Sequence, residues 1–282
     1  MPSPAAPGET RYSVDLMAWR LDLVLLGAAC GLVGGMTSTG GGALLTPGLI
    51  FLGSPPATTI GSDLLIASGM KLFGGGMYAL RGQVHWPTVR WLACGSVPGA
   101  LVGVQVMNLL PVHLLDTLLR RAVGCALLLA GVATLVRVLW RPGLARHTLP
   151  PPWVTVPLGA VIGVLVALTS IGSGSLLLCV LVLLFPLPSS TLVGTDLMHA
   201  LVLSVAASMA HAASGRVDLV LTAWVLLGGI PGAMYGARLA GVLPERPLRT
   251  GLACILIFMG GYLGLEQIRP LPESPRVAHT GE

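Results

Sequence analysis

Two eight-residue stretches, Thr-Ser-Thr-Gly-Gly-Gly-Ala-Leu at residues 37–44 and Thr-Ser-Ile-Gly-Ser-Gly-Ser-Leu at residues 169–176, determine how this chain is organised. Both follow the pattern T-S-x-G-x-G-x-L, and each interrupts a longer apolar run. Because glycine and serine are poor helix formers, each stretch predicts a break between two short helices. The chain is therefore expected to contain two copies of one interrupted unit.

The similarity between the two parts of the chain extends far beyond these stretches. With a shift of 133 positions, residues 55–115 give 18 identities in 61 positions, where about 6 are expected by chance for this composition. The identical pairs include Pro55 and Pro188, Asp63 and Asp196, Gly82 and Gly215, Trp91 and Trp224, and Pro98 and Pro231. We therefore predict a first repeat at residues 21–140, a linker at 141–153 and a second repeat at 154–266, between tails at 1–20 and 267–282.

The composition places most of the chain in lipid. Of its 282 residues, 54% are hydrophobic and only 10% are charged, where soluble domains have about 25%. The mean hydropathy is +0.85. The net charge of +5 is spread over loops, so it suits membrane anchoring better than nucleic-acid binding. This balance excludes soluble, disordered and nucleic-acid-binding classes and predicts a multi-pass membrane protein.

Ten apolar segments are separated by polar, Gly-rich or Pro-rich stretches. They lie at residues 21–36, 43–53, 57–80, 89–107, 118–139, 154–168, 176–187, 190–213, 219–239 and 248–265. A helix that crosses the hydrocarbon needs about 20 residues, and the first two segments of each repeat are short. The fold class is therefore all-α and polytopic, with a broken or re-entrant helix pair in each repeat. If each pair makes one discontinuous crossing, the protein has about eight effective spans; re-entrant hairpins would instead give each repeat an odd number.

Duplicated repeats with interrupted helices in corresponding places are typical of secondary transporters. A helix that starts inside the membrane presents free N–H groups, to which an anion can bind closely where the backbone is glycine. We therefore interpret the two breaks as a substrate site; glycine-mediated helix packing is the alternative. The candidate substrate-binding residues at the breaks are Thr37, Ser38, Gly40, Gly41, Gly42, Thr169, Ser170, Gly172, Ser173 and Gly174.

Other glycines recur every four residues, which places them on one face of a helix. These rows are Gly27, Gly31 and Gly35, then Gly95, Gly99 and Gly103, and then Gly228, Gly232 and Gly236. For them we predict close helix packing rather than a binding role.

Lys71 is the only lysine, and it lies within the apolar segment at residues 57–80. A buried ammonium group is costly unless it has a partner, so it marks a functional site. We predict that Lys71 binds the anionic substrate or gates its path. The alternative is a structural ion pair with Asp63 or Asp196.

Asp63 and Asp196 stand at equivalent positions, in Gly-Ser-Asp-Leu and Gly-Thr-Asp-Leu. In lipid, such a carboxylate can take up a proton and carry it through a transport cycle. Alternatively, both lie in the first turns of helices that begin near Thr58 and Thr191, where they would cap free N–H groups. His199, three residues after Asp196, would relay a proton. His211 is expected at the membrane interface.

The chain resembles the TauE/SafE family of sulfite and organosulfonate exporters, through several motifs that follow one another in order. In the first repeat these motifs are residues 40–49, residues 60–65, Lys71 and residues 82–86; in the second they are residues 168–176, 193–199, 211–218 and 228–232. The resemblance implies a bacterial inner-membrane permease that moves sulfite, sulfonates or related anions, often outward and with the proton gradient. Many members have Ser at the positions of Asp63 and Asp196, and often a hydroxyl residue at Met70.

The leading hypothesis is thus a proton-coupled anion exporter with alternating access between two repeats, with protons and a small anion as its partners. A divalent-cation permease with Asp63, Asp196, His199 and His211 as ligands is the alternative, since carboxylates and imidazoles bind metals. Lys71 near those ligands argues against it. No enzymatic function and no cofactor are expected, because no nucleophile-base spacing stands out. The sequence leaves open whether copies associate.

Overall fold

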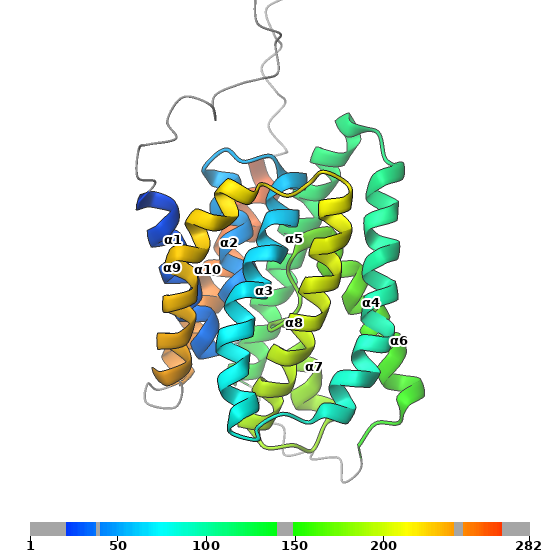
Figure 1. Cartoon of the computed structure of the whole chain (residues 1–282), viewed down its shortest axis with the longest axis vertical. Coiled ribbons are helices and arrows are strands. Elements are labelled where there is room, and N and C mark those ends of the chain that lie inside the picture. Colours follow the sequence, from blue (N-terminus) through cyan, green and yellow to red (C-terminus); the bar gives the residue numbers. More distant parts are fainter. Residues whose placement is uncertain (1–20, 38–39, 140–148, 240–244, 267–282) are drawn as a thin grey trace, which may run out of the picture.

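The computed structural model describes residues 21–37, 40–139, 149–239 and 245–266, and that part of the chain is helical throughout its ten regular elements (Figure 1). Each predicted apolar segment corresponds to one helix, so the all-α prediction is confirmed for the described residues. Ser38, both tails and most of the linker lie outside them. The helices are α1 (Leu21–Thr37), α2 (Gly40–Phe51), α3 (Pro56–Leu80), α4 (Trp86–Leu109), α5 (Val112–Leu139), α6 (Pro152–Thr169), α7 (Leu176–Leu184), α8 (Ser189–Ala213), α9 (Leu219–Leu239) and α10 (Glu245–Glu266).

The chain reverses direction at both breaks. Gly48, near the end of α2, packs against the side chain of Leu26, near the start of α1, so these two helices form a hairpin. Helices α6 and α7 turn back in the same way (Figure 1). With 17 residues, α1 is about 25 Å long. Each broken pair is therefore a helical hairpin whose tip lies inside the molecule.

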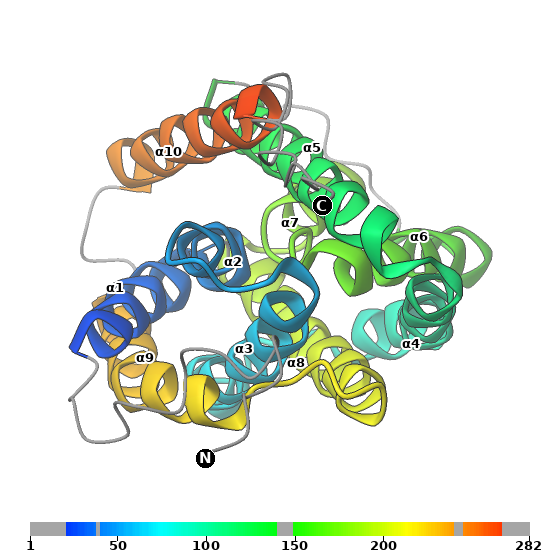
Figure 2. The ribbon, with the colours of Figure 1, turned by 90° about the horizontal axis from the view of Figure 1, so that it is seen from above.

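Glycine rows join helices from different parts of the chain. A Cβ atom on Gly31 of α1 would lie 2.3 Å from the carbonyl oxygen of Gly229 in α9, and one on Gly99 of α4 would lie 2.3 Å from that of Ala160 in α6. These approaches are too close for any side chain, so the helices pack backbone to backbone. The prediction that the three glycine rows serve packing is confirmed. Figure 2 shows α1 beside α9 and α4 beside α6. In both pairs the helices run parallel, since the contacting positions advance together along the two helices.

Helices α3 and α8 pack against each other near the centre of the bundle (Figure 2). They run in opposite directions, because the start of each lies against the end of the other. Gly61, early in α3, lies against the backbone of Arg216, just after α8; Gly194, early in α8, lies against the backbone of Gln83, just after α3. The position numbers in these two contacts differ by 133. Helices α5 and α10 form a further antiparallel pair at the periphery.

The turns that follow α3 and α8 are held by two equivalent hydrogen bonds. Ser62 Oγ accepts a hydrogen bond of 2.8 Å from the backbone N–H of Asp218, and Thr195 Oγ1 accepts one of 2.9 Å from that of His85. Ser62 of α3 thus binds the turn between α8 and α9, and Thr195 of α8 binds the turn between α3 and α4. Gly82 and Gly215 supply the left-handed backbone of these turns, with φ of 68° and 69°.

Within the described part of the chain, five helices are long and apolar enough to cross a membrane: Trp86–Leu109, Leu114–Val136, Pro152–Thr169, Ser189–Ala213 and Leu219–Leu239. Shorter apolar helices cover residues 21–37, 42–51 and 250–263. The protein is therefore a multi-pass membrane protein. Helix α6 starts at Pro152, two residues before the apolar segment predicted at residues 154–168, because proline is favourable in a first turn.

Candidate functional site

The tips of the two hairpins meet inside the molecule. A Cβ atom on Gly42, in the first turn of α2, would lie 2.6 Å from the carbonyl oxygen of Ser170, at the end of α6. The same Cβ would lie 3.2 Å from Oδ2 of Asp63 in α3. Glycine at position 42 therefore permits a close contact between the two breaks, and the structure brings together candidate residues 128 positions apart in the sequence.

The second break is built from left-handed backbone. Ser170 has φ of 59°, and Gly172 and Gly174 have φ of 130° and 96°. Such values are easy for glycine, which has no Cβ atom, and uncommon for other residues, which explains Gly172 and Gly174. Ser170 adopts one in spite of its Cβ atom. In the first break, Gly40 already begins α2. The same sequence pattern thus gives two tips whose local shapes differ.

The threonines of the pattern have a structural use for their hydroxyl groups. Thr37 Oγ1 donates a hydrogen bond of 2.8 Å to the carbonyl oxygen of Val33, and Thr169 Oγ1 donates one of 2.7 Å to that of Leu165. Each hydroxyl proton therefore binds the preceding turn of its own helix. In this conformation neither threonine offers that proton to a substrate.

Asp63 is completely buried in α3. Helix α3 begins at Pro56, so Asp63 lies two turns inside it and does not cap its N-terminus. Its carboxylate instead accepts a hydrogen bond from the hydroxyl of Thr46 in α2, and it lies beside the first turn of α2 at Gly42. The capping interpretation is therefore wrong for α3, because Pro55 and Pro56 start the helix earlier than the predicted Thr58.

Asp196 occupies the equivalent place in α8, which begins at Ser189, and it is also completely buried. Capping of its own helix is excluded for the same reason. His199, one turn further along, is buried too, and its Nε2 shares a hydrogen bond of 2.9 Å with the hydroxyl of Ser96 in α4. Two of the predicted proton-handling residues thus lie on adjacent turns of one buried helix face.

Lys71 is only 9% exposed, near the middle of α3. Its Nζ donates hydrogen bonds of 3.0 Å to Ser173 Oγ, in the second break, and of 3.4 Å to Ser204 Oγ, in α8. The charges of Asp196 and Asp63 also act on the ammonium group. Lys71 therefore connects the central helix pair to the second hairpin tip.

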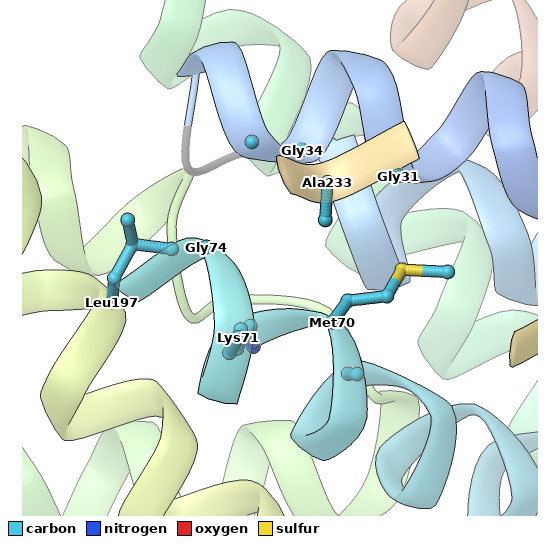
Figure 3. Close-up of a pocket in the computed structure, with 9 residues that line it drawn as sticks. Gly31, Gly34, Met70, Lys71, Gly74, Leu197 and Ala233 are labelled. Carbon is cyan, nitrogen blue, oxygen red and sulfur yellow. The ribbon is translucent and has the colours of Figure 1, made fainter. Parts of the chain in front are cut away.

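A small pocket of about 20 Å³ opens beside Lys71 (Figure 3). Met70, Lys71 and Gly74 of α3 form one wall. The remaining lining residues are Gly31, Gly34, Gly35, Ala67, Leu197 and Ala233. Since a single water molecule needs roughly 10–15 Å³ of such space, the pocket holds little more than one. The conformation is closed around Lys71, and a polyatomic ion needs the surrounding helices to move.

His211 lies in the last turn of α8, near the helix end, and its side chain is completely buried within the protein. Its place at the membrane interface stays a prediction. Its Nε2 donates a hydrogen bond of 3.0 Å to the carbonyl oxygen of Ala167 in α6, whereas His199 is bonded to Ser96. Among the described residues, no three His, Cys, Asp or Glu side chains are grouped as metal ligands. No three of the four proposed cation ligands are thus grouped in the described structure.

Sequence reasoning missed Thr46, Ser96 and Ser204, which are hydrogen-bonded to the buried charged or titratable groups. Ser204 had a usable signal, since it stands 133 positions after Lys71 and is thus its counterpart in the second repeat. Thr46 and Ser96 had none, because isolated hydroxyl residues are common in membrane helices.

Comparisons with known proteins are consistent with this architecture. The family model "Sulfite exporter TauE/SafE" matches residues 23–263. The chain is 36% identical to the probable membrane transporter protein YjnA of Bacillus subtilis over 252 residues, which cover 85% of this chain and 98% of that protein. It is 26% identical to YunE of the same organism over 87% of this chain and 97% of that protein. A probable membrane transporter protein of Xylella fastidiosa is 27% identical over 77% of this chain and 81% of that protein. No solved structure matches.

Proposed function

Since the chain belongs to the TauE/SafE sulfite exporter family, we propose that this multi-pass membrane protein is a secondary transporter of small sulfur-containing anions such as sulfite or organosulfonates. The observation that carries the proposal is the buried ammonium group of Lys71, which is hydrogen-bonded to Ser173 at the tip of the second hairpin. An oxyanion would accept hydrogen bonds from both side chains and from the backbone N–H groups at the start of α7.

Proton coupling is the second part of the proposal. Lys71, Asp63 and Asp196 are all buried in the central helix pair. If both carboxylates are ionised, these three groups have a net charge of −1. A bound monovalent anion would make the net charge −2. Uncompensated buried charge is strongly unfavourable. Uptake of a proton by Asp63 or Asp196 would offset the added charge, and His199 stands one turn from Asp196 to pass protons on.

Alternating access is the third part. The reversal at each break supports hairpins that enter the membrane without crossing it, which would give each repeat an odd number of crossings. This arrangement replaces the count of about eight spans that assumed one crossing per broken pair. The antiparallel packing of α3 with α8 supports repeats of opposite orientation. Movement of one hairpin tip away from the other would open the small pocket beside Lys71 toward one side at a time.

The test is flux into vesicles that contain the purified protein, under an imposed pH gradient. The substrate panel is sulfite, thiosulfate, an alkyl sulfonate and Ni²⁺, with protein-free vesicles as the control. We expect flux of at least one sulfur oxyanion, and we expect the gradient to change its rate. Ni²⁺ flux without anion flux would refute the proposal.

A further inference from the structure

Lys71 and Ser204 are counterparts in the two repeats, 133 positions apart, and their side chains are in direct contact at 3.4 Å. In an object with approximate two-fold symmetry, a residue touches its own counterpart only where both lie next to the axis. The end contacts of the same helices, Gly61 with Arg216 and Gly194 with Gln83, lie on either side of this point. Lys71 and Ser204 therefore mark the axis that relates the two repeats.

This axis carries charge from one repeat only. The first repeat contributes an ammonium group and the second a hydroxyl group. In the hydrogen bonds from Lys71, both Ser204 and Ser173 act as acceptors. A serine hydroxyl also has a proton to donate. An ion with two or more oxygens on one centre could thus accept N–H from Lys71 and O–H from both serines, with donors from both repeats.

We propose that Ser204 is a substrate-binding residue, and that the anion binds across the axis between Lys71 on one side and Ser204 and Ser173 on the other. Anion binding then requires an ammonium group next to the axis, and either α3 or α8 could carry it. This inference rests on the proposed anion transport and specifies its site. It assigns to Ser204 a role that its isolated position in an apolar helix would not suggest.

The decisive experiment exchanges the two side chains. Sulfite-dependent thermal stabilisation of the purified protein is compared for wild type, Lys71→Ser and the exchange variant Lys71→Ser with Ser204→Lys. We expect Lys71→Ser to bind sulfite at least about tenfold more weakly, because a charged hydrogen bond is lost. The exchange variant returns the ammonium group to the axis and should recover most of that loss.

A matched control moves the ammonium group by one turn. Ser208 is buried in α8 one turn after Ser204, and its hydroxyl donates to the carbonyl oxygen of Val205. The variant Lys71→Ser with Ser208→Lys has the same composition as the exchange variant, and we expect it to remain as weak as Lys71→Ser. Equal recovery in this control would overturn the inference, because position would then be irrelevant.

Single substitutions provide a test that does not depend on folding of the exchange variant. Ser204→Ala should weaken sulfite binding several-fold and leave chloride binding unchanged, because a monatomic ion does not need several donors; Ser208→Ala should change neither. If wild type is stabilised by sulfite but Ser204→Ala is indistinguishable from it, the inference fails and the proposed function stands. If no anion of the panel stabilises wild type, the proposed function fails and the inference with it.

Discussion

The two hairpin tips carry the same eight-residue pattern but face opposite charges. The first tip, at Gly42, lies against the carboxylate of Asp63, and the second, at Ser173, is hydrogen-bonded to the ammonium group of Lys71. Both charged groups belong to α3. At the equivalent places α8 has Asp196 and Ser204, so the cation is present only once. The comparison shows that the glycine-rich pattern determines the backbone of a tip, whereas the central helix determines its charge.

Removing the cation should produce the largest effect. We expect Lys71→Ala to weaken sulfite binding by a factor of ten or more, about 1.5–3 kcal/mol for a charged hydrogen bond. The check is sulfite-dependent thermal stabilisation, with size-exclusion chromatography to establish that the variant is folded. Unchanged affinity in a folded variant would show that the charge difference between the tips has no role in binding.

Adding a methyl group at the first tip should have the next largest effect. In Gly42→Ala the new Cβ would meet the backbone of Ser170, which cannot move aside as a flexible side chain would. We expect a loss of about 1–3 kcal/mol in the free energy of unfolding. The equivalent Gly174→Ala should lower the free energy of unfolding by about 1–2 kcal/mol for a different reason, because its φ of 96° strains any residue with a Cβ atom.

Gly76 provides the matched control for both alanine variants, because it is helical and nothing lies within 4 Å of its Cβ position. Denaturant unfolding of all three variants in detergent is the measurement. The contact between the tips would be unimportant if Gly42→Ala were as stable as Gly76→Ala.

Much of this arrangement could be predicted from the sequence. Hydrophobic segments gave all ten helices, and glycine spacing gave the packed faces, because both depend on local periodicity. The buried position of Lys71 followed from its distance from the segment ends. The reversal of the chain at each break could not be predicted, because a Gly-rich break is compatible with both a continued and a reversed chain direction. The partner of His211 could not be predicted either, because only the fold shows that Ala167 of α6 lies against it.

Neutralising the carboxylates tests the comparison through pH. We expect sulfite flux by the wild type to rise as pH falls, because a protonated Asp63 or Asp196 offsets the charge of the anion. One coupled proton changes affinity by about tenfold per pH unit. Asp63→Asn and Asp196→Asn resemble the protonated state, so the variant at the coupled position should lose this dependence. Asp22 is the control, since it lies at the start of α1. A pH profile that neither substitution changes would refute proton coupling at these sites.

The threonines of the pattern should give the smallest effect. Because Thr169 donates its hydroxyl proton to the preceding turn of α6, we expect Thr169→Val to change sulfite affinity by about twofold at most. Thr37→Val should behave alike. The same binding assay applies, with Lys71→Ala as the reference for a full effect. A loss as large as that reference would mean that the hydroxyl turns toward the substrate when the pocket opens.

The glycine-packed pairs also determine how the protein must be assembled. The outer arm of the first hairpin, α1, packs on α9, and that of the second, α6, packs on α4. Each hairpin is thus anchored to a helix that is made from the other half of the gene. A chain divided between α5 and α6 would yield two fragments that each present unfilled glycine surfaces, and coexpression should be required for either to persist in the membrane. The first half of the chain therefore has its glycine-packed faces covered only after the second half has been synthesised.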